Sequence, residues 1–329
     1  MKERDLSIDY VKGLAIILVY MGHAILYYPP GLFANCGWSE VLGKMIVSCN
    51  MPLFFFISGL LFAFSKKNNM EVVRDKAKRL LIPYLFAMMF VVVAKQVLPS
   101  SMAYKTTAGE GILTDIFIMG GDRWFVYVLM WIFLLSLPLR KLKSSKWLLV
   151  VIAIALSVTL LIQLPKYFLM HKVVWYISFF LLGMYLNQFY AEFRKWNTQY
   201  AVVVSVVFTL LNIVFVLQLM QVPLLKRAIL PIIGTVFFIT LAFLIDDYCK
   251  SHSRQPAIVK YIAYCGRYSL QFYLFTFAYP VIRYVVVNLM HITNPLLIFS
   301  LVLILQLIVM TLIVEVTRRI KLLKIPMGY

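Results

Sequence analysis

The sequence predicts an all-α polytopic integral membrane protein, a bundle of about ten transmembrane helices with both termini in the cytoplasm. Hydrophobic residues make up 63% of the 329-residue chain and charged residues only 14%, whereas soluble domains are usually about half apolar and a quarter charged. Apolar runs of about 17–25 residues, the length that crosses a bilayer, recur along the chain. Basic residues are concentrated in alternate loops between these runs, which indicates a fixed orientation in the membrane.

The apolar runs define the elements that we expect. In chain order they are residues 8–28, 41–64, 80–98, 113–139, 147–164, 173–190, 200–221, 229–247, 262–289 and 296–317. The fourth run is irregular, because residues 111–121 end in Gly120-Gly121 and could form a separate short or re-entrant piece. The ninth contains Pro280, which can kink a span where neighbouring helices satisfy the freed backbone groups. All loops are short, so we expect residues 1–329 to form a single transmembrane domain with no soluble domain.

Loop charge predicts which side of the membrane each loop faces. The strongly basic loops and tail contain Lys66, Lys67, Arg74, Lys76, Lys78, Arg79, Arg140, Lys141, Lys143, Lys146, Arg194, Lys195, Lys250, Arg254, Lys260, Arg318, Arg319, Lys321 and Lys324. The opposite loops contain only Lys105, Arg123, Lys166, Lys172, Lys226 and Arg227. By the positive-inside rule the basic set is cytoplasmic, and so are both termini, in agreement with an even number of spans. The net charge of +19 is thus a feature of membrane topology, and nucleic acid is not an expected partner.

The first apolar run carries the residues with the clearest chemical potential. Asp9, Lys12, Tyr20, His23 and Tyr27 fall on one polar stripe of the predicted helix. At about 100° and 1.5 Å per residue, Lys12 and His23 lie within about 20° of one face and roughly 16 Å apart. Ionisable groups at membrane depth are costly and normally face a protein interior or a wet cavity. Histidine is the usual general base near neutral pH, so His23 is the candidate base and Asp9 the neutralising partner of Lys12.

Each of these features also has a structural interpretation. His23 could be hydrogen-bonded inside a helix bundle while Lys12 extends to the lipid headgroups. Ser58 could stabilise a developing oxyanion, or Ser58-Gly59 could simply let two helices approach closely. Lys76 and Arg79 are three residues apart and share a helical face, where they could hold phosphates or contact lipid headgroups. The four cysteines show no metal-ligand spacing, and no metal site is expected.

Three patterns occur in order along the first part of the chain. They are Asp9-x-x-Lys12 followed by His23, Phe54-Phe55-Phe56-Ile57-Ser58-Gly59, and Lys76-x-x-Arg79 followed by Pro83. Weaker patterns follow at 123–126, 179–183 and 268–274. Together they resemble the membrane-bound acyltransferase-3 family, in particular its stand-alone sugar O-acetylases. The chain departs from the family pattern where Lys12 replaces an Arg, where Asp122 stands in place of a frequent His, and where Thr276 replaces a late His.

The resemblance implies an O-acyltransferase, most simply an O-acetyltransferase, in a bacterial inner membrane. Its donor would be cytoplasmic acetyl-CoA or another acyl-CoA, and its acceptor a hydroxyl of a cell-surface or lipid-linked sugar. Lys12, Lys76 and Arg79 would hold the donor phosphates, with Ser58 beside the donor. His23 would take the proton of the acceptor hydroxyl or carry the acyl group transiently. Asp122 could orient His23 or receive a sugar hydroxyl.

Two other classes of protein remain compatible with the polar stripe. A transporter or flippase would use the buried Lys12 and His23 as a relay, and release of CoA would distinguish an acyltransferase from it. A structural or sensory membrane protein should tolerate His23→Gln, which preserves size and polarity. The order of the family patterns favours the acyltransferase.

Overall fold

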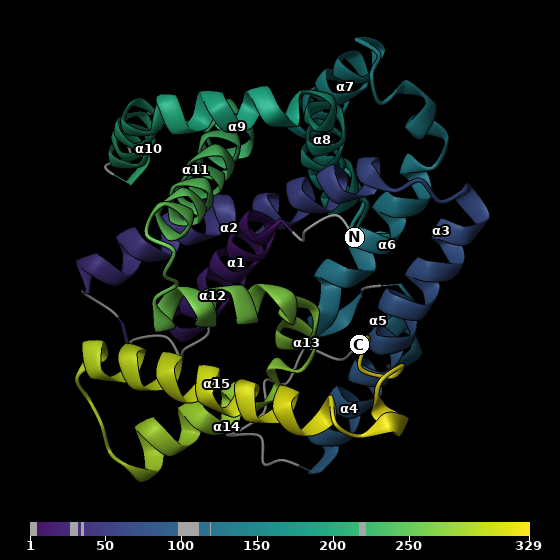
Figure 1. The fold of residues 1–329 in the computed structure, drawn as a ribbon. Helices are drawn as coiled ribbons and strands as arrows, with labels where there is room; N and C mark the ends of the chain where they lie inside the picture. Colours follow the sequence, from purple (N-terminus) through teal and green to yellow (C-terminus); the bar gives the residue numbers. More distant parts are fainter. Residues whose placement is uncertain (1–4, 27–31, 34–35, 98–111, 119, 217–221) are drawn as a thin grey trace.

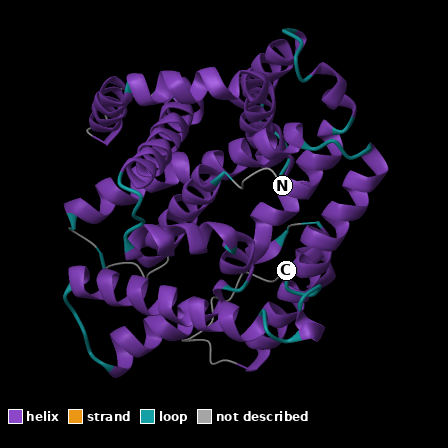
Figure 2. Ribbon diagram, in the orientation of Figure 1, coloured by secondary structure: helices purple, strands orange, loops and turns teal. Residues whose placement is uncertain are grey.

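The computed structural model is helical throughout the part of the chain that it describes, residues 5–26, 32–33, 36–97, 112–118, 120–216 and 222–329, with no strand among them (Figure 2). The α-helices are α1 (Leu6–Leu26), α2 (Gly37–Phe64), α3 (Asn69–Lys76), α4 (Ile82–Val97), α5 (Ile112–Phe117), α6 (Trp124–Ser136), α7 (Trp147–Leu161), α8 (Met170–Leu186), α9 (Tyr190–Gln199), α10 (Ala201–Val216), α11 (Leu230–Ser251), α12 (Ala257–Arg267), α13 (Ser269–Leu274), α14 (Tyr279–Tyr284) and α15 (Pro295–Thr317). Short 3-10 or π segments are η1 (Ala77–Leu81), η2 (Gly121–Arg123), η3 (Pro138–Leu142), η4 (Tyr167–Leu169), η5 (Asn187–Phe189), η6 (Leu225–Ile229), η7 (Thr276–Ala278), η8 (Val285–Leu289) and η9 (Lys321–Leu323). The all-α prediction is confirmed.

Five helical stretches are long and apolar enough to cross a membrane. They are Leu6–Ile25, Gly37–Phe64, Tyr167–Gln199, Leu225–Ser251 and Pro295–Thr317. Two shorter apolar helices, Trp147–Leu161 and Ala201–Val216, coincide with two more of the predicted runs. The runs at 80–98, 113–139 and 262–289 are helical as well, but as shorter or broken pieces. The protein is therefore a helical membrane protein.

The breaks have identifiable backbone causes. Gly120 and Gly121 adopt positive φ values of 67° and 47°, which glycine reaches at little steric cost. They separate α5 from α6, as the irregular fourth run led us to expect. The ninth run is divided into α12, α13 and α14. Pro280 does not kink a span as expected; it lies in the first turn of α14, where its missing N–H removes no helical hydrogen bond.

Helix α1 is the centre around which the functional residues are placed. It packs against α2, α11, α12 and α15, and it lies in the middle of the bundle in Figure 1. Its contact with α12 is unusually close, because a Cβ on Gly13 would be 2.0 Å from the Ile262 carbonyl oxygen and one on Gly266 1.8 Å from that of Asp9. Only glycine fits such a backbone approach, so α12 is held directly on the turn that carries Asp9 and Lys12.

Aromatic side chains connect the remaining core helices. Phe55 of α2 stacks on Tyr176 of α8 with ring centroids 4.5 Å apart, and it meets Phe125 of α6 edge-on at 4.9 Å. Phe125 in turn packs against Tyr273 of α13 at 5.1 Å. Such offset and edge-to-face pairs stabilise a core beyond the area that they bury. The chain of rings links α2, α8, α6 and α13 into one rigid unit beside α1.

Candidate active site

Asp9 and Lys12 form the ion pair that the sequence predicts. The Asp9 side chain is only 3% exposed and its Oδ1 lies 3.3 Å from the Lys12 ammonium. The Lys12 side chain is 22% exposed, so the cation is held at one end of α1 with part of its surface open. A buried carboxylate of this kind is tolerated because it is paired. The pair gives α1 a fixed positive group at its first turns.

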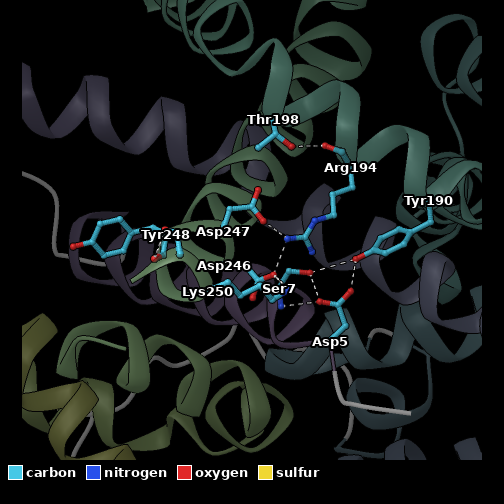
Figure 3. Close-up of polar contacts among 10 residues, drawn as sticks. Asp5, Ser7, Tyr190, Arg194, Thr198, Asp246, Asp247, Tyr248 and Lys250 are labelled. Atoms are coloured by element: carbon cyan, nitrogen blue, oxygen red, sulfur yellow. Dashed lines mark hydrogen bonds and ion pairs between the residues drawn. The ribbon is translucent and has the colours of Figure 1, made fainter. Parts of the chain in front are cut away.

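A polar network fixes the beginning of α1 against α9 and α11 (Figure 3). Asp5 accepts hydrogen bonds from the Ser7 backbone N–H at 3.0 Å and from the Tyr190 hydroxyl at 2.7 Å. Arg194 bridges the carboxylates of Asp246, at 2.7 Å, and Asp247. Burial raises the pKa of Asp5, but the hydrogen bonds from Ser7 and Tyr190 outweigh it and leave the pKa below its ordinary value. The sequence pattern did not single out this network.

His23 lies in the last turn of α1 and is partly buried. Its ring centroid is 5.8 Å from that of Tyr279 on α14, with the rings inclined at 60°. One turn earlier, the fully buried Tyr20 donates a hydrogen bond of 2.8 Å to the Phe272 carbonyl of α13. The positive charge of Arg123 acts on the His23 ring. The candidate base thus lies next to the Tyr279 ring and within electrostatic reach of Arg123.

Arg123 is the functional candidate that the sequence analysis missed. Its side chain is buried, with a residue exposure of 6%, and Nε donates to the Leu274 carbonyl at 2.6 Å. Next to it, the Phe125 N–H donates to the Tyr273 hydroxyl at 3.1 Å. The Leu274 carbonyl lies at the end of α13 and the Phe125 N–H at the start of α6, where backbone groups lack partners within their own helix. The two hydrogen bonds therefore join the ends of these two helices. One signal was available, since Arg123 is among the few cations on the sparsely charged side.

Asp122 lies directly beside this cation. Its carbonyl accepts a 3.3 Å hydrogen bond from Arg123, and its carboxylate attracts the guanidinium electrostatically. The structure therefore brings Asp122, Arg123 and His23 into one electrostatic environment. The role predicted for Asp122 toward His23 or a sugar hydroxyl stays a prediction.

Lys76 and Arg79 lie within electrostatic reach of each other but differ in their surroundings. The Lys76 ammonium lies 4.1 Å from the centre of the Phe133 ring, and burial lowers its pKa to about 8. Arg79 is instead largely exposed and pairs with Asp75 at 3.1 Å. Arg79 lies within the π segment η1, Ala77–Leu81, and the joint role of the two cations in holding donor phosphates stays a prediction.

The loop between α2 and α3 is held at this same end of the bundle. Arg140 donates to the Ser65 carbonyl at 2.7 Å and to the Lys67 carbonyl at 2.9 Å. Lys67 in turn pairs with Asp75 at 3.1 Å. Several of the basic residues that the sequence assigned to cytoplasmic loops are therefore gathered next to Lys76.

Ser58 is too far from His23 for the oxyanion role considered above. Gly22, the neighbour of His23, packs against Ile46 of α2, because a Cβ on Gly22 would lie 3.3 Å from the Ile46 side chain. Ile46 is therefore the α2 residue at about the same depth as His23. Ser58 is twelve residues further along α2, roughly 18 Å at helical rise. Its neighbours Ile57 and Leu60 instead line a small cavity with Val11 at the Lys12 end of α1. Gly59 packs directly against the Phe180 carbonyl, which confirms the close helix approach.

The comparison with known families agrees with this arrangement. A family model described as an acyltransferase domain matches residues 5–315 of the chain. The chain belongs to the acyltransferase-3 family. The match covers α1 to nearly the end of α15 and confirms the family that the sequence patterns indicated.

Individual relatives of this acyltransferase-3 protein align over shorter segments. Nodulation protein NolL of Sinorhizobium fredii is 31% identical over 160 residues, which are 47% of this chain and 42% of that protein. Nodulation protein NolL of Mesorhizobium japonicum is 31% identical over 157 residues, 47% and 41% of the two chains. Inner membrane protein YcfT of Escherichia coli is 41% identical over 69 residues, 18% and 19% of the two chains. The aligned part spans less than half the length of each relative, and no solved structure matches.

The two ends of α1 offer different chemistry. One end carries the Asp9–Lys12 pair, and the other carries an imidazole next to the Tyr279 ring and within electrostatic reach of a buried guanidinium. Such sets of groups are suited to holding an anion and to moving a proton, respectively. Within the described residues, no three His, Cys, Asp or Glu side chains are close enough together to hold a metal ion.

Proposed function

We propose that this protein is a membrane O-acyltransferase of the bacterial inner membrane. It transfers an acyl group, most simply acetyl, from cytoplasmic acyl-CoA to a hydroxyl of a cell-surface or lipid-linked sugar. One observation carries this proposal: in a chain that matches the acyltransferase-3 family over residues 5–315, a single helix holds Lys12 at one end and His23, beside Arg123, at the other. The separation of about 16 Å suits the extended pantetheine arm of a donor whose phosphates stay at the membrane surface.

The topology that goes with this function has about ten spans in one domain, residues 1–329, with both termini in the cytoplasm. The helices at all of the predicted apolar runs support it, as does the clustering of loop cations around Lys76. The similarity to YcfT, an inner membrane protein, supports the location. The acceptor sugar binds on the side of the membrane opposite the cytoplasm, near His23.

The residues of the donor side are Lys12, Lys76, Arg79 and Ser58. Lys76 is the most informative of them, because it is a desolvated ammonium that lies over an aromatic ring. A phosphate would supply the charge-assisted hydrogen bonds that the ring does not. Lys12 is a point charge and cannot bind a phosphate in the bidentate manner of arginine, so it contributes attraction rather than orientation. Ser58 lies at the same end of α1 and would contact the donor there.

At the other end, His23 accepts the proton of the acceptor hydroxyl while its oxygen attacks the thioester carbonyl carbon. Arg123 offers positive charge near the place where the carbonyl oxygen becomes negative. The carbon–sulfur bond then breaks, and the imidazolium returns its proton to the departing thiolate. Asp122 holds Arg123 and orients the acceptor. A two-step route through an acyl-His23 intermediate uses the same residues and differs only in whether the histidine becomes acylated.

Transfer of a labelled acetyl group from one face of a membrane to a sugar on the other face tests this proposal. Acetyl-CoA labelled in its acetyl group is supplied to the cytoplasmic face of oriented vesicles, and a surface-glycan extract is supplied on the other face. We expect labelled glycan together with stoichiometric free CoA. Movement of a solute without any thioester consumption would contradict the proposal and indicate a transporter. The exposed His252 at the end of α11 gives a matched control, since His252→Ala should retain transfer.

A further inference from the structure

Gln306 is a fully buried amide with neither of its polar atoms satisfied. It lies in the middle of α15 with an exposed fraction of 0%, and its Oε1 and Nε2 have no hydrogen-bond partner among the residues that the structure describes. An unsatisfied buried polar group destabilises the folded protein. Inside a membrane protein such a group usually faces the bundle interior and serves a function.

The position of Gln306 relates it to the candidate site. The buried face of α15 consists of Ile298, Val302, Gln306, Met310 and Val314. Val302 packs in one cluster with Ala24, the neighbour of His23, and with Tyr279. Gln306 is one turn away from Val302, about 6 Å along the axis. It therefore lies close to the depth of the His23 ring.

The other end of α15 reaches the donor side. Thr317 hydrogen-bonds the Tyr329 hydroxyl at 2.7 Å, and Gly328 packs against Pro83 and the Arg79 carbonyl. From Thr317 back to Gln306 is eleven residues, or roughly 16 Å. Gln306 thus lies between the Arg79 end of the bundle and the His23 end, along the direction that a donor arm would follow.

Gln271 is a second buried glutamine, and its amide forms hydrogen bonds within the protein. It is 4% exposed, and its amide nitrogen donates to the carbonyls of Met327 and Gly328, both at 3.0 Å. Gln306 has an almost equal degree of burial but no such bonds. This contrast indicates that the Gln306 amide is available to hydrogen-bond a group outside the chain.

We propose that Gln306 binds a secondary amide in the thioester arm of the donor, an inference that rests on the proposed acyl-CoA function. A carboxamide carries both a donor and an acceptor, so it can donate to the carbonyl of a secondary amide or accept from its N–H, and the pantetheine arm of CoA contains two such amides. A sugar hydroxyl offers a weaker match to the location, because Gln306 lies on the donor side of Val302 rather than beyond His23. Gln306 is thus a positioning residue for the donor.

Thermal unfolding tests the binding role without any turnover. Gln306→Leu should raise the melting temperature, since it removes an unsatisfied amide, whereas Gln271→Leu should lower it by breaking two hydrogen bonds. Saturating free CoA should raise the melting temperature of the wild type more than that of Gln306→Leu. Equal protection of the two proteins by CoA, or a lower melting temperature for Gln306→Leu in the absence of CoA, would overturn the inference.

Kinetics with two donors then identify the group that is bound. For acetyl-CoA, Gln306→Leu should raise KM by about tenfold with little change in kcat, as expected for one lost hydrogen-bonded pair. For an acetyl thioester of a simple alkanethiol, which has no amide, the two proteins should be equal. A raised KM for the glycan alone would assign the side chain to the acceptor and overturn the inference while leaving acyl transfer intact. Absence of turnover in the wild type would instead count against the proposed function, and protection by CoA would still decide the role of Gln306.

Discussion

Arg123 Nε donates a hydrogen bond of 2.6 Å to the carbonyl oxygen of Leu274, a residue 151 positions away in the sequence. The bond joins the start of α6 to the end of α13. The Tyr20 hydroxyl of α1 donates a hydrogen bond to another carbonyl of α13, that of Phe272. Two hydrogen bonds of Arg123 go to backbone carbonyls, which are uncharged acceptors and do not neutralise the guanidinium. Arg123 can therefore hold the helices together and still present a cation to His23.

The charge of Arg123 is predicted to be needed for turnover. Arg123→Gln should lower kcat by about 100-fold or more, in the range seen when one stabilising group is removed from an oxyanion site. Arg123→Lys should keep a larger part of the activity, because it preserves the charge. The measurement is CoA release under saturating donor.

Tyr273→Phe separates this effect from helix positioning. It removes the bond to the Phe125 N–H at 3.1 Å and should cost about 1 kcal/mol of stability with a small change in kcat. If Arg123→Gln and Tyr273→Phe lowered kcat equally at matched stability, the electrostatic role of Arg123 would be wrong.

The Asp9–Lys12 pair is predicted to serve donor binding. Lys12→Arg should retain activity, whereas Lys12→Ala should raise the KM for acyl-CoA by about tenfold, the effect of losing one charge-assisted contact. Lys12→Ala also leaves the buried Asp9 carboxylate uncompensated and should lower the melting temperature. The double variant Asp9→Asn with Lys12→Met should recover the stability but not the KM. An unchanged KM in Lys12→Ala would exclude the phosphate role.

Lys76 makes donor binding dependent on pH. Its pKa is lowered to about 8 by burial, so the ammonium form that binds phosphate is present below pH 8 and is lost above it. The KM for acyl-CoA should be constant up to pH 8 and then rise, by up to about tenfold per unit. Lys76→Arg should remove this rise, since arginine stays charged, and Lys76→Met should show a high KM at every pH. A wild-type KM that does not change between pH 7 and pH 9.5 would contradict the role of Lys76.

Asp5 is predicted to stabilise the fold in a pH-dependent way. Its pKa is lower in the folded protein, so its contribution is present above the ordinary carboxyl pKa and is lost as the pH falls through the folded value. Asp5→Asn should therefore melt at a lower temperature than the wild type at pH 7, and the difference should shrink as the pH falls below the ordinary carboxyl pKa. A difference that persists unchanged at pH 3 would show that the Ser7 and Tyr190 hydrogen bonds do not depend on the charge.

The fold class could be predicted because a bilayer imposes length and composition on each crossing helix. The apolar runs around α1, α2, α11 and α15 were found at nearly the correct bounds for this reason. The pieces α12, α13 and α14 were not separated in advance, because their breaks depend on tertiary contacts. The Tyr20–Phe272 bond is one of these contacts.

The candidate site could be predicted only where it is local in sequence. Asp9 and Lys12 are one turn apart, so helical geometry was enough to pair them. Arg123 and Gln306 are brought toward His23 by the packing of α6, α13 and α15 around α1, which no local pattern encodes. The π segment that contains Arg79 was not expected, because it has no reliable signature in the sequence.

Release of CoA from acetyl-CoA by the purified protein in nanodiscs, with and without an extract of surface glycans, tests the role of His23 most directly. The wild type and His252→Ala should release CoA in a glycan-dependent manner. His23→Ala should release none, while inserting and melting like the wild type. Glycan-dependent release by His23→Ala at the wild-type rate would contradict the proposed site.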